Sequence, residues 1–572
     1  MKIDLFLKNA HIFNVYLKKF IDGNIAISGN RFLYVGTEEP PVLPEKVIDL
    51  NGKYIIPGLI DCHMHIESTM CGPQTFMNWA VKNGVTTLIA EPHEIANVFG
   101  LEGINAMAAS MKDGPADVYL AIPSSVPSTN SSLETTGAEI NSDSVEKMIH
   151  MEKVICLGEV MNGHDLIKGS DTKTSRLVRQ VRENRPDFSL EGHLPHFLGW
   201  ELAQILYTGV NSDHTDQTLG TIKQRIAGGC FLELQEKTLR PELITYLVDN
   251  NLFEHFAIVT DDTMPDKFIE RGQLNYLVKK AMTVGLTPEQ AIYAATYTPA
   301  RRMGLRDKGS IAPGRVADFV ILDDPKEFTV LSTYCAGREV YAREARPIPE
   351  AQDISFPKHF YQSVHVVPLC KNDFSIKTEQ ENGIVRCRLL CVMDNTTFVH
   401  EETIELPVKD YEIQWESSPY NLAVVIERHG KNGGRGYAFV GGEAMKHGAA
   451  ATTYAHDHHN LFVIGQTKID MQTAANAIID SQGGYATAID GAIVGFAPLP
   501  IAGILSDQPL DVLGKQIGKV TQSLKDWGYN HSNVIMSLST LSLPVSPYFK
   551  LTDKGIIDVI NQKIVPLIVG HE

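Results

Sequence analysis

The sequence lacks the excess of positive charge that a nucleic-acid partner requires. It has 51 lysines and arginines against 68 aspartates and glutamates, which gives a net charge of −17. An acidic surface repels a phosphate backbone, so we expect no nucleic-acid partner, whereas a small neutral substrate is compatible with this charge. The sequence also has no run of 18 apolar residues, and we therefore expect neither a membrane span nor a membrane partner.

Cysteine is scarce. Eight cysteines are scattered through 572 residues, and no Cys-x-x-Cys pair occurs. Scattered cysteines are typical of free thiols in a reducing compartment, not of a disulfide framework. The N-terminal residues alternate as a strand does and lack the continuous apolar stretch of a signal peptide. We therefore expect a cytoplasmic protein.

The chain is too long for one hydrophobic core. Residues 1–58 contain short alternating stretches separated by Gly and Asn, which predict a small β unit, and β character returns over 301–348. Between them, strands and helices alternate over 59–300 in about eight units, which predicts a (β/α)8 barrel inserted into a β-sandwich built from both flanks. Residues 349–572 are expected to form a separate C-terminal α+β domain.

Apolar stretches place the strands of the expected barrel. After a first strand that leads into His63, strands are predicted at 85–90, 117–123, 154–160, 188–193, 210–214, 228–234 and 256–262. Two helix boundaries also have clear signals. Gly84 suits the position after a helix end, and Thr287 with Gln290 predicts a capping box at a helix start.

Metal-competent side chains stand at the ends of these strands. The first strand ends in "DCHMH", where His63 and His65 point the same way because alternation returns every second residue to one face. Later strands end in Glu159, His193, His214 and the pair Asp261 and Asp262. The carboxyl ends of barrel strands surround one mouth, so these residues are expected to converge there although they are far apart in the sequence.

Taken one at a time, these residues have ordinary explanations, such as a salt bridge for Glu159 or a helix cap for Asp261. Their convergence favours divalent ions of the Zn, Mn or Fe kind over Ca or Mg. Two ions bridged by Glu159 would suit this number of ligands. Because metal ions lower the pKa of bound water, the set predicts a hydrolase in which Asp261 takes and returns a proton.

Several longer motifs resemble known families. The stretch "PGLIDCHMH", the later "GH", "DH" and "TDD", and "GSIAPGRVADFVILD" resemble the amidohydrolase superfamily. More narrowly, "GVTTLIAEPHEIANVFG" (84–100), "AHDHHN" (455–460) and "PLPIAGILSD" (498–507) resemble the adenine deaminase family. The resemblance implies a metal-bearing barrel and an enzyme of purine salvage that converts adenine and water to hypoxanthine and ammonia.

The resemblance also implies a role for each ligand. His63 and His65 would bind one metal ion, His193 and His214 would bind the other, and Glu159 would bridge the two. The ions would be Mn or Fe, with Zn as a further option. The size and the family imply a homo-oligomer, either a dimer or a larger assembly, whose partner is a small-molecule purine base.

Other residues would complete the site. Asp261, preferred to Asp262 because it comes first after the strand, would be a ligand and the proton shuttle, and His93 would assist catalysis beside the metals. The residues expected on the substrate side are Glu94, Thr215, His456, Asp457 and His459. Alternatively, these residues have no role in the site: residues 93–94 would only form the polar start of a helix, and residues 456–459 would form a solvated turn.

The sequence departs from the family beside the expected ligands. It has "GHLPH" (192–196) where family members have "GHAPG", "SDHTD" (212–216) where they have "SDHES", and "LQEKT" (234–238) in place of an Arg-Glu-Gly-Ser block. Thr215 therefore stands where an acid is usual, and its smaller side chain would leave room for a methyl group. An N6-substituted adenine, such as N6-methyladenine, is thus an alternative substrate.

Two further classes of function are compatible with parts of the sequence. One is another cyclic-amide hydrolase of the superfamily, against which the purine-deaminase motifs at 91–98 and 455–460 weigh. The other is a catalytically silent metal-binding protein, against which the intact ligand set weighs.

Overall fold

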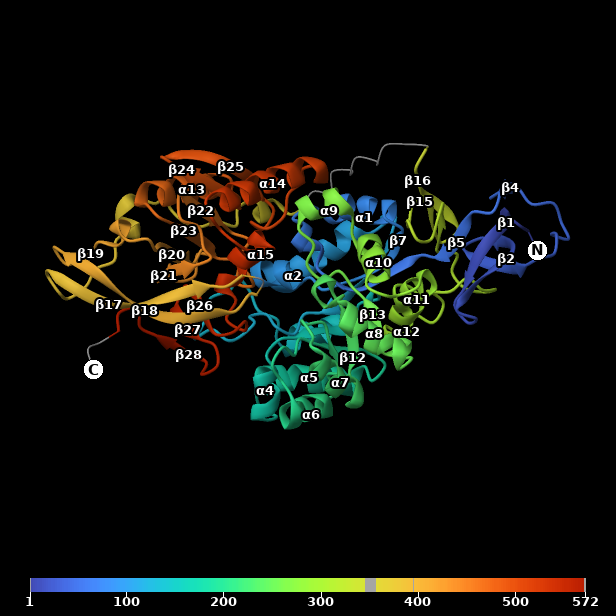
Figure 1. The fold of residues 1–572 in the computed structure, drawn as a ribbon, viewed down its shortest axis with the longest axis horizontal. Coiled ribbons are helices and arrows are strands. Elements are labelled where there is room, and N and C mark those ends of the chain that lie inside the picture. The colour runs from blue at the N-terminus through green and yellow to red at the C-terminus, as the bar shows by residue number, and fades with distance from the viewer. Residues whose placement is uncertain (1, 345–355, 395, 570–572) are drawn as a thin grey trace.

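The computed structural model describes residues 2–344, 356–394 and 396–569. Three parts follow one another along the long axis: an N-terminal sheet, a central α/β part and a C-terminal part (Figure 1). The predicted boundary between 348 and 349 lies outside the described residues. Within the described chain, no helix combines the length and the apolar character needed to cross a membrane.

The N-terminal sheet takes strands from both flanks of the central part. Its strand order is β16-β15-β14-β5-β1-β2-β3, and β4 pairs with β1. The strands are β1 (Leu5–Asn14), β2 (Lys19–Ser28), β3 (Arg31–Gly36), β4 (Lys46–Asp49), β5 (Tyr54–Pro57), β14 (Phe319–Leu322), β15 (Val330–Cys335) and β16 (Arg338–Ala342). The returning strand β14 lies antiparallel to β5, so the chain leaves the central part beside the point where it entered.

The central part contains two parallel sheets of five and three strands. The larger has the order β10-β9-β8-β7-β6 and the smaller has β11-β12-β13. The strands are β6 (Leu59–Met64), β7 (Val85–Ala90), β8 (Asp117–Ile122), β9 (Val154–Val160), β10 (Ser189–Gly192), β11 (Ser212–Asp213), β12 (Phe231–Leu234) and β13 (Phe256–Ile258). Every residue of β6 and β7 is buried, as is usual for parallel strands covered on both faces.

Helices connect these strands, as the alternating pattern predicts. They are α1 (Pro73–Lys82), α2 (His93–Met111), α3 (Ser142–Met148), α4 (Gly163–Lys168), α5 (Lys173–Asn184), α6 (Gly199–Thr208), α7 (Leu219–Ala227), α8 (Pro241–Asp249), α9 (Pro265–Arg271), α10 (Leu274–Thr283), α11 (Pro288–Ala294) and α12 (Tyr297–Arg302). Both predicted boundary signals are confirmed. Thr287 and Gln290 form the capping box of α11, and Gly84, with φ of 82°, follows the end of α1.

The positions of the predicted strands are also confirmed, but several strands are shorter than expected, and two of them have no more than three residues. The stretch 210–214 contributes only Ser212–Asp213, and the stretch 256–262 contributes only Phe256–Ile258. After Ile258 the chain leaves the regular ladder before Thr260, Asp261 and Asp262, so these side chains do not follow the alternation of the strand.

The C-terminal part is built around a nine-stranded sheet with the order β19-β18-β17-β21-β20-β23-β22-β24-β25. Its strands are β17 (Gly383–Val392), β18 (Val399–Lys409), β19 (Glu412–Ile413), β20 (Asn421–Ile426), β21 (Arg435–Gly442), β22 (Ala449–Thr452), β23 (Leu461–Gly465), β24 (Gly484–Ile489) and β25 (Ala492–Pro498). A second sheet and three helices complete it: β26 (Phe549–Thr552), β27 (Gly555–Asp558), β28 (Lys563–Val565), α13 (Lys468–Asp480), α14 (Leu510–Asp526) and α15 (Val534–Ser539).

The C-terminal part packs directly on the central part. One hydrophobic cluster contains buried residues of both, including Ile95 of α2 and Tyr454. The Thr135 hydroxyl donates to the Asp553 carboxylate over 2.6 Å, and the Asn460 amide donates to the Thr135 carbonyl over 2.8 Å. The loop between β22 and β23 is therefore held against the central part.

Candidate metal centre

Two histidines at the end of β6 begin the site. His63 and His65 are both buried, and their ring centroids are 5.3 Å apart. The Nδ1 atom of His65 lies 3.1 Å from the Glu91 carbonyl oxygen. A carbonyl can only accept, so Nδ1 of His65 carries the proton and its Nε2 is free to bind a metal ion. Nε2 of His63 is buried and has no hydrogen-bond partner.

Glu159, at the end of β9, faces two groups of histidines with its two oxygens. Oε1 lies 3.5 Å from Nε2 of His65. Oε2 lies 3.0 Å from Nδ1 of His193 and 3.1 Å from Nε2 of His214. One carboxylate thus reaches both sides of the site, which is the arrangement needed to bridge two cations.

Asp261 completes the group of side chains around His63 and His65, at the end of β6. Its Oδ1 atom lies 3.3 Å from Nε2 of His65 and 3.7 Å from Nε2 of His63. The Gln235 amide donates to the other oxygen, Oδ2. Asp262 points elsewhere, since its carboxylate accepts a hydrogen bond from the Ser68 hydroxyl.

The two central carboxylates are ionised. Burial alone would raise the pKa of Glu159, but His214 and His193 hold it well below its usual range. Burial would likewise raise the pKa of Asp261, and the neighbouring imidazoles of His63 and His65 hold it well below its usual range. By contrast, burial and the charge of Asp261 raise the pKa of Asp262. Of the two aspartates, Asp261 is therefore the one whose ionised form its surroundings stabilise.

The donor set fits divalent metal ions. His63, His65 and Asp261 each offer one atom within 4.8 Å of the others, and so do His63, Glu159 and His214. Imidazole and carboxylate donors together suit first-row transition metals and zinc. The unpartnered Nε2 of His63 has a physical explanation in such an ion, because a buried polar atom without a partner is otherwise costly. His193, with its side chain 30% exposed, lies on the open side of the group.

Thr215 is not part of this group. Its hydroxyl donates to Oδ2 of Asp213 over 3.0 Å, and its amide donates to Oδ1 of the same residue over 3.1 Å. Asp213 also pairs with the buried Arg225. Thr215 therefore supports the turn that carries His214.

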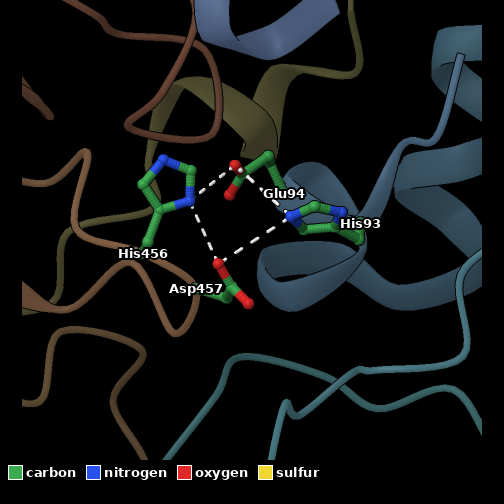
Figure 2. Close-up of side chains that lie close together, drawn as sticks. All are labelled: His93, Glu94, His456 and Asp457. Atoms are coloured by element: carbon green, nitrogen blue, oxygen red, sulfur yellow. Dashed lines mark hydrogen bonds and ion pairs between the residues drawn. The ribbon is translucent and has the colours of Figure 1, made fainter. Parts of the chain in front are cut away.

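Four other predicted residues gather in a second, adjacent cluster. His93 and Glu94 come from the start of α2, and His456 and Asp457 come from the loop between β22 and β23 (Figure 2). All four are buried. His459 joins them through a hydrogen bond to the second oxygen of Glu94. The alternative of a solvated turn over residues 456–459 is therefore wrong.

The sequence reasoning missed two carboxylates that support the centre. Glu233, in β12, places Oε2 3.7 Å from Nδ1 of His63 and 3.9 Å from Nδ1 of His214. Glu91, just after β7, accepts the Glu159 amide proton over 2.6 Å. A signal was present, since both follow apolar stretches in the same way as the predicted ligands, in "CFLEL" and "LIAEP".

Replacing Glu233 with glutamine is expected to weaken binding of Mn²⁺ about 10- to 100-fold, the usual effect of losing an outer partner of ligating histidines. Glutamine removes the carboxylate whose oxygen lies 3.7 Å from Nδ1 of His63 and 3.9 Å from Nδ1 of His214. Isothermal titration of metal-stripped protein measures the change. The Glu236→Gln variant is the control, because Glu236 instead pairs with Arg271. Unchanged affinity in Glu233→Gln would show that this carboxylate does not support the ligands.

Comparison with known proteins gives consistent matches over the whole chain. The amidohydrolase family model matches residues 54–196 and 198–340, and the model of the adenine deaminase C-terminal domain matches residues 396–563. An adenine deaminase of Clostridium perfringens is 46% identical over 99% of this chain and 100% of its own length. Adenine deaminase 2 of Shouchella clausii is 43% identical over 100% of both chains. Among solved structures, a beta-aspartyl dipeptidase of Fervidobacterium islandicum has a TM-score of 0.46 at 18% identity, over 62% of this chain and 100% of its own.

Proposed function

This chain belongs to the adenine deaminase family of amidohydrolases, and from that premise we propose that it hydrolyses adenine to hypoxanthine and ammonia. One observation carries the proposal: relatives named adenine deaminase match both the central and the C-terminal parts, over their full length, at 43% to 46% identity. The buried group of histidines around Glu159 supports the same chemistry. None of these relatives is named for an N6-substituted substrate.

The ligands fall into two sets that share Glu159. His63, His65 and Asp261 would hold one divalent ion beside Oε1 of Glu159, and His193 and His214 would hold the other beside Oε2. Mn or Fe is the proposed metal, with Zn as the alternative, because imidazole and carboxylate donors accept all three. When bound, such ions act as Lewis acids and lower the pKa of water.

Asp261 is the proposed proton shuttle. Addition of water to C6 of adenine releases a proton, and departure of the amino group requires one. The ionised carboxylate of Asp261 accepts the proton as the oxygen–C6 bond forms, and it delivers the proton to the amino nitrogen as the C6–N6 bond breaks. One adenine and one water thus give one hypoxanthine and one ammonia. Gln235 orients the carboxylate through its hydrogen bond to Oδ2.

His93 is the proposed positioning residue of the centre. Its Nδ1 atom lies 3.6 Å from Oε1 of Glu91 and 3.8 Å from Oε1 of Glu159, and its ring packs edge-on against His65 at 4.6 Å. A contact of Thr215, Glu94, His456, Asp457 or His459 with the substrate stays a prediction.

We infer that the two parallel sheets of the central part belong to one closed (β/α)8 barrel. Two backbone hydrogen bonds support closure. The Asn211 amide donates to the Leu190 carbonyl over 3.2 Å beside β10 and β11, and the Asp261 amide donates to the His63 carbonyl over 3.0 Å between β13 and β6. In a closed barrel the strand ends would all face one mouth, which is where the ligands stand.

We also propose that the protein acts in the cytoplasm as a homo-oligomer. All eight cysteines are free thiols, and seven of them are buried, which suits a reducing compartment. The size of the chain and its family support the assembly.

Ammonia release from a panel of purines tests the substrate. The panel contains adenine, N6-methyladenine, adenosine and guanine, each measured as kcat/KM with Mn-loaded protein. We expect kcat/KM for adenine to exceed that for N6-methyladenine by about 10- to 200-fold, because one extra carbon in a fitted pocket usually changes kcat/KM by that factor. A preference for N6-methyladenine would move the proposal to that substrate, and no turnover of any purine would overturn it.

A further inference from the structure

The second cluster presents four donor atoms to one point. Nδ1 of His456 lies 2.9 Å from Oε1 of Glu94 and 3.0 Å from Oδ1 of Asp457. Nε2 of His93 lies 3.4 Å from Oε1 of Glu94 and 3.8 Å from Oδ1 of Asp457. The four contacts form a closed ring in which every side chain points inward (Figure 2).

Hydrogen bonds among the four side chains cannot provide a partner for each of the four inward-facing atoms. Nδ1 of His456 can carry only one proton, yet a carboxylate oxygen stands within 3.0 Å of it on either side. Oε1 of Glu94 is fully buried and has no hydrogen-bond partner. Leaving a buried carboxylate oxygen unpaired is costly.

A cation at the centre would satisfy all four atoms at once. A four-coordinate ion with bonds of about 2.1 Å separates its ligand atoms by about 3.4 Å, and the four contacts of the ring scatter around that distance. All four donor atoms lie within 4.8 Å of one another. Two imidazoles and two carboxylates suit Zn²⁺, Mn²⁺ or Fe²⁺.

We propose that His93, Glu94, His456 and Asp457 bind a third divalent cation, separate from the pair at Glu159. Two ligands come from the start of α2 in the central part, and two come from the loop between β22 and β23 in the C-terminal part. The ion fastens the two parts together beside the metal centre. This site does not depend on the proposed deamination.

The surroundings hold the ligands in place. The second oxygen of Glu94 accepts a hydrogen bond from His459, whose carbonyl oxygen in turn accepts one from Arg428. The Ser539 hydroxyl accepts the His456 amide proton over 3.1 Å. Both sides of the site are therefore fixed by contacts that do not use the four donor atoms.

Metal content and anomalous diffraction of Mn-loaded protein test the proposal. We expect three ions per chain by mass spectrometry and an anomalous peak between the four donor atoms. The His456→Ala and Asp457→Asn variants should bind two ions and lose that peak alone. The Asp553→Asn variant is the control, because it weakens the hydrogen bonds to Thr135 across the same interface and should keep three ions.

Other results would overturn the proposal. Two ions per wild-type chain with no peak in the ring would make the cluster a hydrogen-bonded ion-pair network. Density for a soaked purine among the four side chains, in place of a metal peak, would make it a substrate subsite.

A Glu159→Gln variant that loses the neighbouring ions but keeps the peak in the ring would establish that the third site is independent.

Discussion

Replacing Asp261 with asparagine is expected to lower kcat for adenine about 10²- to 10⁴-fold, the range that a positioned proton-transfer group contributes. Asparagine keeps the size of the side chain and an oxygen donor but cannot accept the proton released by water. Because His63, His65 and Glu159 remain, we expect the variant to keep its metal ions. Steady-state kinetics measure the loss, and metal analysis of the same sample separates it from loss of metal.

The Asp262→Asn variant is the matched comparison, since the two aspartates are adjacent and differ in what they contact. The Asp262 carboxylate is bound to Ser68, whereas Asp261 faces His63 and His65. We expect Asp262→Asn to lose much less activity than Asp261→Asn. The reverse order would assign the proton shuttle to Asp262.

Replacing Glu159 with glutamine is expected to remove the metal pair and with it the activity. Glutamine has no charge and only one oxygen, so it cannot face His65 on one side and His193 and His214 on the other. We expect activity to fall to that of chelator-treated protein, a larger loss than the roughly 10- to 100-fold usual for an outer partner. Metal analysis and ammonia release measure the two effects.

Glu191→Gln is a control for burial at a strand end. Glu191 is as buried as Glu159 and lies near the end of β10, but its carboxylate pairs with Arg302 and neighbours Glu233, one step removed from the histidines. This control should keep its metal content even if its stability falls. If Glu159→Gln kept both ions and most of its activity, the bridging role would be wrong.

Much of the site could be predicted from the sequence because parallel α/β topology brings the carboxyl ends of neighbouring strands together. The alternation of "CHMH" predicts that His63 and His65 share a face, and the structure places both against Asp261. Glu159, His193 and His214 required only the recognition that each stands at or near the end of a predicted strand. These predictions needed the fold class but no knowledge of side-chain packing.

The remainder depends on contacts between segments that are distant in the chain. The cluster "HDHH" looks like a solvated turn until the loop is seen packed on α2, so that His456 meets Glu94 across more than 300 residues. Glu233 could not be separated from an ordinary buried ion pair without the two imidazoles that flank it. Likewise, the hydrogen bond from Thr215 to Asp213 is set by a local turn that alternation does not describe.

The most direct test of the central claim is hypoxanthine formation from adenine by one preparation in three states: Mn-loaded, stripped by a chelator, and reloaded. We predict turnover in the first state, none in the second and full recovery in the third. Undiminished conversion of adenine by the metal-free protein would contradict the proposed role of the histidines and carboxylates around Glu159. Absence of turnover in the fully loaded protein would contradict the proposed substrate.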